Sequence, residues 1–232
     1  KGEDDAGIGP NIFHGQWSSP SYGVVNGKGQ LFFGGGDGIC YAFEPKPVYD
    51  EDEDLDFLRK IWWYDSNPPE YKKDENGKAI KYPAAEGPSE IIATPVYYKG
   101  HVYIAIGQDP EHGEGNGNLV CINADTGKKV WDYRKIQRTI STVAIDESNG
   151  LLFASDYTGY VYCVDAKTGK EWWRVSLGMS SSSRRWGSAS SPILYKDTVI
   201  INASDESDHD HDVLGADLQP HSHLRRNGHP AL

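Results

Sequence analysis

The sequence predicts an all-β protein, a partial β-propeller built from four-stranded antiparallel blades. The stretch CINADTGKKVW at residues 121–131 recurs about 42 residues later as CVDAKTGKEWW at residues 163–173. Each copy reads as an apolar strand, a Thr-Gly turn and a second strand with a Trp, and a period of about 40–45 residues is typical of propeller blades. The composition agrees, because 12% aromatic residues and 26 glycines suit short strands joined by tight turns.

The first unit covers about residues 17–65 and is predicted as a meander whose last strand is delayed. An Asn-Gly pair at Asn26 and Gly27 lies between two β-prone runs, which is a strong hairpin signal. The strands are expected at residues 22–25, 30–33, 39–43 and 60–64. Before the last strand, an insertion of about ten residues with an acidic run replaces the Thr-Gly turn of the other units.

Two more complete units follow, at about residues 91–134 and 139–176, and a fourth begins at about 187–205 but is expected to be incomplete. The segment 68–90 between the first two units is polar and rich in Pro, Lys and Glu. It is expected to form a surface loop, as connecting segments usually do. The third unit is the most compact because it carries no insertion.

The two ends of the chain lie outside the repeat. Residues 1–16 form an N-terminal lead-in without a clear period, and residues 206–232 contain five His, two Pro and no strand with a Trp. We expect this tail to be disordered. The chain begins at Lys1 without a Met or an apolar signal region, so any targeting segment is expected to have been removed or not included.

Charge and hydropathy exclude two classes of function. The formal net charge of -11 disfavours binding to a phosphate backbone, so no nucleic acid is expected as a partner. No apolar run approaches the roughly 20 residues that a membrane-spanning helix needs. The three cysteines are far apart, and each lies at a similar point of the repeat, so they are interpreted as buried apolar residues.

With these motifs in place, residues 17–205 resemble the PQQ-like β-propeller repeat family, over roughly three and a half blades. The blade ends are the two stretches described above, and three blade starts share a small-residue-Pro pattern. These starts are Ser18-Ser19-Pro20, Ala93-Thr94-Pro95 and Ser190-Ser191-Pro192. The turns at 35–38 and 155–159 match the family's turn between the second and third strands.

The resemblance implies how blades dock and how many there should be. In this family a blade-end Trp docks between neighbouring blades, which suits Trp62, Trp131 and Trp173, with Gly127 and Gly169 in the adjoining turns. Complete members have seven or eight blades, so this chain is expected to be a fragment of such a parent. An open arc would leave unpaired strand edges at both ends and an uncovered face on the first and fourth blades.

The resemblance also implies alternatives for function. Quinoprotein dehydrogenases of this family hold PQQ beside Ca²⁺ on the propeller axis, often under an adjacent Cys-Cys pair, and no such pair occurs here. No cofactor is therefore predicted, and a non-catalytic module that binds a protein or small ligand is favoured. A fragment of a PQQ- and Ca²⁺-dependent oxidoreductase and a structural repeat domain of a larger protein are the alternatives. Export to the periplasm or the cell exterior is implied by the resemblance alone.

Two clusters are candidate binding sites. The loop with Asp109, Glu111, His112 and Glu114 offers mixed ligands on a Gly-rich segment, and loops on rigid scaffolds often carry binding sites. The alternating Asp50, Asp52 and Asp54 could offer carboxylate oxygens to Ca²⁺. A solvated acidic loop is the simpler interpretation of this run, because the Gly and distal Glu of an EF-hand are missing.

Overall fold

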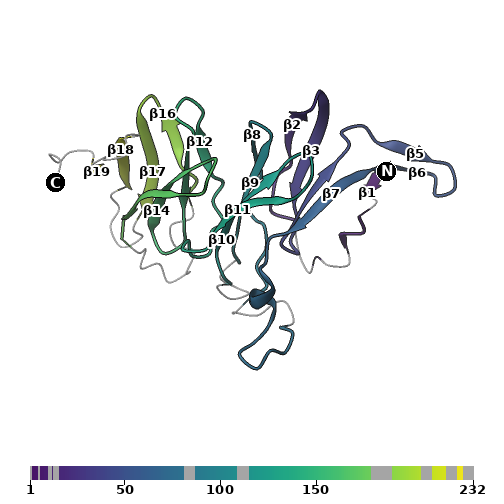
Figure 1. Cartoon of the computed structure of the whole chain (residues 1–232), viewed down its shortest axis with the longest axis horizontal. Helices are drawn as coiled ribbons and strands as arrows, with labels where there is room; N and C mark the ends of the chain where they lie inside the picture. The colour runs from purple at the N-terminus through teal and green to yellow at the C-terminus, as the bar shows by residue number, and fades with distance from the viewer. Residues whose placement is uncertain are drawn as a thin grey trace.

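The computed structural model describes residues 2–4, 6–9, 12, 16–80, 87–108, 115–178, 190–204, 211–217 and 224–226. Four four-stranded antiparallel sheets make up most of it, and a smaller three-stranded sheet lies beside the N-terminus (Figure 1). A short 3-10 helix, η2 (Pro69–Lys72), follows the first of these sheets. None of the described helical segments has the length and apolar character needed to cross a membrane.

Each of the first three sheets is one blade of the predicted repeat. The first has the order β2-β3-β4-β7, with β2 (Ser21–Val25), β3 (Lys28–Gly34), β4 (Ile39–Phe43) and β7 (Lys60–Asp65). The second contains β8 (Val96–Tyr98), β9 (His101–Ile106), β10 (Asn118–Asn123) and β11 (Lys129–Tyr133). The third contains β12 (Ala144–Asp146), β13 (Leu151–Ser155), β14 (Tyr160–Asp165) and β15 (Glu171–Ser176). The fold class predicted from the repeat is confirmed.

A register shift recurs at the same place in these three sheets and orients the Trp strands. It falls between Ala42 and Phe43, between Cys121 and Ile122, and between Cys163 and Val164. Such a bulge increases the local twist and turns the side chains that follow. The Trp residues Trp62, Trp131 and Trp173 pair with the residue just before each shift.

The fourth sheet combines two strands of the fourth unit with two strands from the segment 206–232. It has the order β16-β17-β18-β19, with β16 (Ile193–Tyr195), β17 (Thr198–Ser204), β18 (His211–Asp217) and β19 (Leu224–Arg226). The last two strands come from the segment expected to be disordered. The strand β18 pairs with β17 in antiparallel register from Thr198 with Asp217 to Ser204 with His211, which satisfies backbone groups along that edge of β17.

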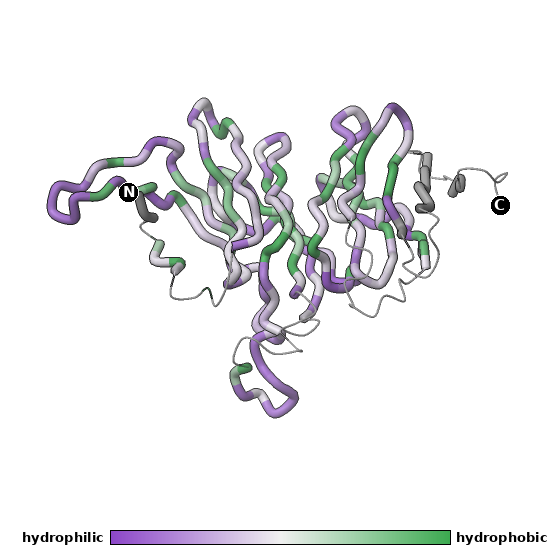
Figure 2. The backbone as a smooth tube through the Cα atoms, turned by 180° about the vertical axis from the view of Figure 1, so that it is seen from behind, coloured by the Kyte–Doolittle hydropathy of each residue, from purple (hydrophilic) through white to green (hydrophobic). Residues whose placement is uncertain are grey.

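The blades stand side by side in chain order, with the first and the fourth at opposite ends of the molecule (Figure 1). The apolar residues therefore form a separate cluster at each junction. Phe32 and Ala42 pack against Ile104 and Ile122 between the first two blades, and similar clusters join the second to the third and the third to the fourth. Figure 2 shows this division, with apolar strands inside and hydrophilic turns at both ends of the blades.

The outer face of the first blade is covered in part, and Tyr22 and Trp63 on it remain 58% and 55% exposed. Ile8 is buried against Tyr41 and Phe43, and Ile12 and Leu58 pack around them. The N-terminal lead-in also contributes β1 (Gly2–Asp4), which pairs in parallel with β6 (Leu55–Leu58). The lead-in thus covers apolar surface that a further blade would otherwise cover.

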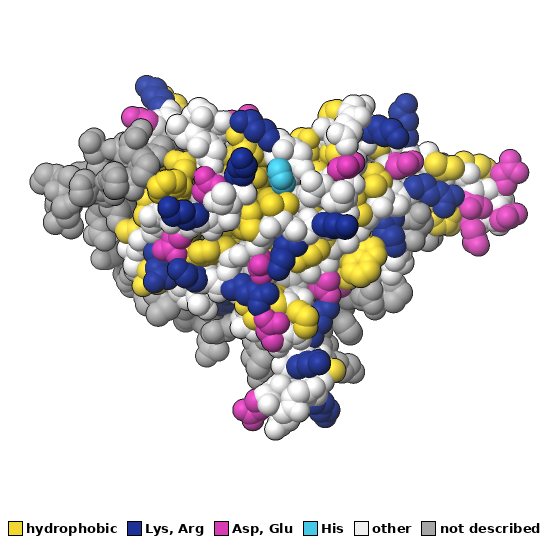
Figure 3. All heavy atoms as spheres, in the orientation of Figure 1, with side chains coloured by type: hydrophobic (Ala, Val, Ile, Leu, Met, Phe, Trp, Pro, Cys, Tyr) yellow, Lys and Arg dark blue, Asp and Glu magenta, His cyan; other side chains and the backbone are white. Residues whose placement is uncertain are grey.

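The acidic insertion of the first blade is a β-hairpin. The strand β5 (Val48–Asp50) pairs with β6, and the tip between them gathers acidic side chains at the right edge of Figure 3.

The two ends of the blades carry different kinds of turn. We call one the hairpin end, and it carries the turns at 26–27, 99–100, 124–128, 147–150 and 166–170. The opposite one is the loop end, and it carries the turn at 35–38 and the described parts of segments 66–90, 107–117, 134–143 and 156–159. The connections between blades are therefore gathered at the loop end, whereas the β5–β6 insertion of the first blade lies at the hairpin end.

Candidate functional site

The residues predicted as binding sites are distributed over different parts of the molecule. Residues Asp109, Glu111, His112 and Glu114 lie outside the described residues. The flanking Gln108 and Gly115 are described, and both lie at the loop end. Asp50, Asp52 and Asp54 lie at the tip of the β5–β6 hairpin, away from the loop end (Figures 1 and 3).

The acidic tip uses its carboxylates to form its own turn. Asp50 accepts a hydrogen bond from the backbone N–H of Asp52 at 3.1 Å, and the Tyr49 hydroxyl donates to Asp54 at 2.6 Å. Within the described ranges, no group of three or more His, Cys, Asp or Glu side chains is arranged to hold a metal ion. Asp50 and Asp54 are therefore engaged within the hairpin tip itself.

The Trp residues expected at the blade junctions occupy two different environments. Trp62 Nε1 donates to the carbonyl of Ala124 at 2.8 Å, and Trp131 Nε1 donates to the carbonyl of Ala166 at 3.1 Å. Trp173 lies at the same position of the third blade, but its buried Nε1 has no acceptor among the described residues. An indole N–H left unpaired in this way destabilises a fold by about 1–3 kcal/mol.

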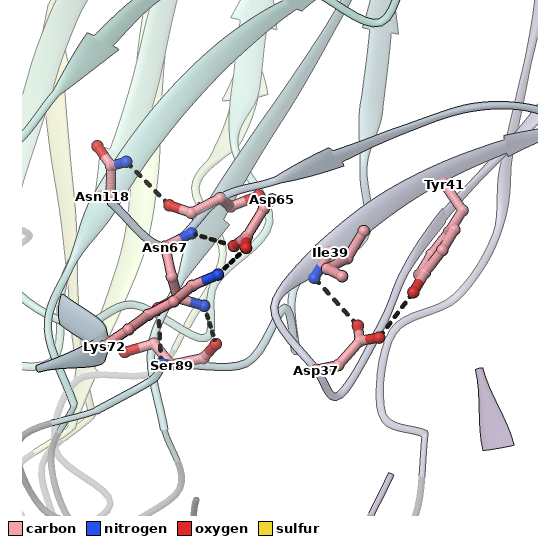
Figure 4. Close-up of polar contacts among 9 residues, drawn as sticks. Asp37, Ile39, Tyr41, Asp65, Asn67, Lys72, Ser89 and Asn118 are labelled. Atoms are coloured by element: carbon pink, nitrogen blue, oxygen red, sulfur yellow. Dashed lines mark hydrogen bonds and ion pairs between the residues drawn. The ribbon is translucent and has the colours of Figure 1, made fainter. Parts of the chain in front are cut away.

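The base of the insertion between the first two blades is locked to the sheets, as Figure 4 shows. The Asn67 side chain donates to the Ser89 carbonyl at 2.8 Å and accepts from the Ser89 N–H at 2.8 Å. Asn118 donates to the Ser66 carbonyl at 3.1 Å, and Lys72 pairs with Asp65. Ser89 and Glu90 are 1% and 3% exposed, so the end of this segment is part of the core rather than a surface loop.

Beyond this base, residues 69–80 form a charged arm that extends past the sheets at the bottom of Figure 1. The arm is a small hairpin, because Lys73 bridges to Ala79 and Asp74 accepts from the N–H groups of Asn76 and Lys78 at 2.9 Å. Two further contacts tie it to the second blade: the Tyr71 hydroxyl donates to the Gly117 carbonyl at 3.1 Å, and Glu70 pairs with Arg134.

A cavity of about 940 Å³ lies along the arm. Its lining includes Glu70, Lys73, Asp74, Glu75, Lys78 and Asn116. The charged members are exposed and of both signs, as the space-filling view of the arm shows (Figure 3). This surface can pair with charged and hydrogen-bonding groups of a partner, and its hairpin geometry is already formed.

A buried polar cluster supports the loop end between the second and third blades. Arg138 is 4% exposed, its guanidinium carbon lies 3.4 Å from the centroid of the Tyr157 ring, and its Nη1 donates to the Gln108 carbonyl at 3.3 Å. Gln108 in turn donates to the Pro88 carbonyl at 2.6 Å. A cation buried on an aromatic ring strengthens such a junction. The sequence offered no signal for this cluster, since its members come from separate segments.

The turns at the loop end are organised by single aspartates. Asp156 is fully buried and accepts hydrogen bonds from the Gln137 N–H and the Tyr162 hydroxyl, at 3.0 and 2.6 Å. In the first blade, Asp37 accepts from the Ile39 N–H at 3.1 Å and the Tyr41 hydroxyl at 2.7 Å (Figure 4). Burial raises the pKa of Asp37, and these two hydrogen bonds oppose the rise.

The three cysteines are packing residues rather than nucleophiles. Cys40, Cys121 and Cys163 are 0% exposed, and burial raises the pKa of Cys121 and Cys163 to about 12 and also raises that of Cys40. Because the thiolate is the reactive form, we expect a thiol reagent at pH 8 to modify the native chain about a hundredfold more slowly than free cysteine. The chain in concentrated urea is the control. Modification of a folded chain at the free-cysteine rate would contradict this placement.

A second cavity, of about 420 Å³, lies at the hairpin end between the second and third blades. Its lining includes Tyr98, Lys99, His101, Tyr103, Glu147 and Lys167. The Tyr103 hydroxyl donates to the Ala166 carbonyl at 3.0 Å, and the Tyr98 hydroxyl donates to the Glu147 carbonyl at 3.0 Å. These hydroxyls therefore join the two blades, and the cavity belongs to the junction.

Comparison with known proteins is consistent with this geometry. A family model described as outer membrane protein assembly factor BamB matches residues 59–219. The tetrathionate hydrolase of Acidithiobacillus ferrooxidans is 32% identical over 109 residues, which are 47% of this chain and 20% of the hydrolase. BamB of Moranella endobia is 30% identical over 116 residues, which are 50% of this chain and 25% of that protein.

Solved structures share the fold. BamB from Moraxella catarrhalis matches with a TM-score of 0.52 at 11% identity, over 93% of this chain and 48% of its own. The quinohemoprotein alcohol dehydrogenase ADHIIG from Pseudomonas putida HK5 matches with a TM-score of 0.52 at 18% identity, over 86% of this chain and 37% of its own. The chain thus spans a quarter or less of these curated relatives and less than half of the solved propellers.

Proposed function

The chain belongs to the outer membrane protein assembly factor BamB family of PQQ-like propellers, and from this premise we propose that it is a non-catalytic module that binds other polypeptides outside the cytoplasm. The observation that carries the proposal is the charged arm at residues 69–80. It is exposed at its tip, already folded into a hairpin, and anchored to two blades at its base.

A preformed charged hairpin favours binding for a physical reason. Ordering a flexible loop opposes association, and that loss is smaller when the loop is rigid beforehand. The buried Asp156 and the half-buried Asp37 at the loop end do not offer comparable chemistry. Asp37 and Asp156 are engaged with tyrosine hydroxyls and backbone N–H groups of their own turns. The fold shared with the quinohemoprotein dehydrogenase gives no reason by itself to assign dehydrogenase activity to this chain.

The experiment measures binding of a dye-labelled outer membrane β-barrel polypeptide, diluted from urea, by fluorescence anisotropy. Reversing the charge of two exposed arm residues, with Lys73→Glu and Lys78→Glu together, is expected to weaken binding about tenfold, because two charge contacts are lost. The matched control reverses two exposed lysines at the hairpin end, with Lys128→Glu and Lys167→Glu together, and is expected to stay within about twofold.

Three outcomes would overturn the proposal. Two are the absence of binding by the unaltered chain and an equal loss of affinity in the arm and control variants. The third is stoichiometric binding of PQQ in the presence of Ca²⁺, followed by quinone absorbance, because it would support the oxidoreductase alternative instead. A tenfold loss confined to the arm variant supports the proposal.

A further inference from the structure

The cavity of about 420 Å³ at the hairpin end owes one wall to a long turn of the third blade. The turn between β12 and β13 covers residues 147–150, whereas the matching turns at 26–27 and 99–100 have two residues each. All residues of the longer turn line the cavity, together with Lys99 of the second blade. Sites for small molecules commonly enclose roughly 300–1,000 Å³, so this cavity is large enough to hold one.

Hydrogen bonds of the fold hold the wall of the cavity in place. In the longer turn, Asp146 accepts from the Ser148 hydroxyl and from the Asn149 side chain, both at 2.6 Å. The Ala166 N–H donates to the Gly150 carbonyl at 2.9 Å, which joins this turn to the next turn of the same blade. A site that is formed before its ligand arrives loses less entropy on binding.

Two buried tyrosine rings and an alanine form the inner surface of the cavity. Tyr98 and Tyr103 are 9% and 2% exposed, and Ala166 is also buried. The tyrosine hydroxyls already donate to the backbone carbonyls of Glu147 and Ala166, at 3.0 Å each. The rings therefore offer apolar surface rather than free hydroxyls, and this surface suits an apolar or aromatic group of a ligand.

Two charged side chains of opposite sign line the cavity from different blades. Lys99 belongs to the second blade and Glu147 to the third, and both are exposed. The ammonium of Lys99 lies 4.8 Å from the centroid of the Tyr98 ring, a cation–π contact that holds it beside the cavity. In the part of the chain that the structure describes, neither Lys99 nor Glu147 forms an ion pair. Both charges are therefore available to a ligand.

A histidine in the same lining supplies a hydrogen-bond acceptor. Nδ1 of His101 lies 3.0 Å from the carbonyl oxygen of Lys99, and a carbonyl oxygen can only accept a hydrogen bond. In the neutral ring Nδ1 therefore carries the proton, and Nε2 is left as an acceptor. His101 is partly buried and lines the cavity, so a positively charged group of a ligand can donate to it.

We propose that this cavity binds a free α-amino acid with an apolar or aromatic side chain. The ammonium of Lys99 pairs with the α-carboxylate, and Glu147 and His101 accept hydrogen bonds from the α-ammonium. The side chain of the ligand lies against the rings of Tyr98 and Tyr103. A zwitterion fits better than a simple anion or cation, because a ligand with one charge leaves either Lys99 or Glu147 without a counter-charge.

The test titrates the full chain with L-phenylalanine and with L-leucine by calorimetry. We expect one ligand per chain and a dissociation constant of about 1 mM, in line with the small size of the ligands. In 3-phenylpropionate the ammonium is missing, in 2-phenylethylamine the carboxylate, and in glycine the side chain. Each of these is expected to bind at least about fivefold more weakly than phenylalanine, because one set of contacts is lost. Absence of binding by both amino acids, or equal affinity of 3-phenylpropionate, would overturn the proposal.

Lys99→Met is expected to weaken phenylalanine binding about fivefold and to leave 2-phenylethylamine binding unchanged, because that ligand has no carboxylate. The matched control is Lys196→Met. Lys196 occupies the same turn position in the fourth sheet, its ammonium lies 5.3 Å from the Tyr195 ring centroid, and it does not line the cavity. This control should stay within about twofold of the unaltered chain. Equal losses in the two variants would count against the site.

Glu147→Gln tests the other charge of the site. It is expected to weaken phenylalanine binding about threefold and to strengthen binding of 3-phenylpropionate, because a negative charge beside an anion is removed. Weaker binding of both ligands would contradict the assigned role of Glu147. The arm variant Lys73→Glu with Lys78→Glu should leave phenylalanine affinity unchanged, so this proposal and that for the arm fail separately. Thermal unfolding of each variant confirms that it is folded.

Discussion

Replacing Gly169 by Ala is expected to lower the free energy of unfolding by about 2–4 kcal/mol. Two effects add at this position. A Cβ would lie 2.7 Å from Cδ2 and Cε3 of Trp131, inside van der Waals contact. The backbone also has a φ of +70°, which Ala adopts less readily than Gly. The indole would have to move, and its 3.1 Å hydrogen bond to Ala166 would weaken.

Gly150→Ala is the matched control for this substitution. Gly150 lies in the same blade at a φ of +67°, and nothing lies within 4 Å of the added Cβ. It should therefore show only the backbone effect, about 1 kcal/mol. Urea unfolding followed by circular dichroism measures both variants. Equal losses would mean that the contact between the turn and Trp131 adds nothing to the junction.

Replacing Asp156 by Ala is expected to destabilise the chain by about 3–5 kcal/mol. The carboxylate is 0% exposed and accepts from Gln137 N–H, from the N–H and hydroxyl of Thr158, from Tyr160 N–H and from the Tyr162 hydroxyl. Its removal leaves the buried Tyr162 hydroxyl unpaired and removes the acceptor of the other, partly buried donors. The turn also positions Tyr157 beneath Arg138, so we expect the buried cluster at the loop end to loosen as well.

Asp146→Ala is the control, because it shows whether the loss of stability comes from the burial of the carboxylate or only from the loss of its hydrogen bonds. Asp146 also organises a turn of the third blade, accepting from Ser148 and from the Asn149 side chain at 2.6 Å, but these groups remain in contact with solvent. Water can replace the lost acceptor there, so a loss of about 1 kcal/mol is expected. Thermal unfolding of both variants at pH 7 makes the comparison. If Asp156→Ala were no more harmful than Asp146→Ala, the buried carboxylate would not be the organiser of its turn.

The strands of the first three blades could be predicted from the sequence because their signals are local. Asn26 and Gly27 mark a hairpin, with φ of +49° and +77°. The apolar run at 160–165 lies between two turns that contain Gly and Thr, which are typical turn residues. Local patterns did not predict strands whose formation depends on pairing with a neighbouring strand. Residues 211–217 have a weak strand pattern of their own, and the structure pairs them as β18 with β17.

The candidate site was largely invisible to sequence reasoning for a related reason. Segment 68–90 reads as polar throughout, yet Ser89 and Glu90 are buried because Asn67 pairs with the Ser89 backbone from 22 residues away. Arg138 and Tyr157 belong to segments without a shared motif. A polar residue in a connecting segment gives no indication of which distant backbone group it will meet.

The sequence by itself determined the blade repeat, the order of the strands and the positions of the indoles and turn glycines, because periodicity and turn chemistry act over a few residues. Only the tertiary structure decided which of those indole N–H groups donates a hydrogen bond to a backbone carbonyl. Trp62 reaches Ala124 and Trp131 reaches Ala166 across separations of 62 and 35 residues, and Trp173 has no such partner within the described residues. A hydrogen bond of that range depends on how neighbouring blades pack, which no single repeat encodes.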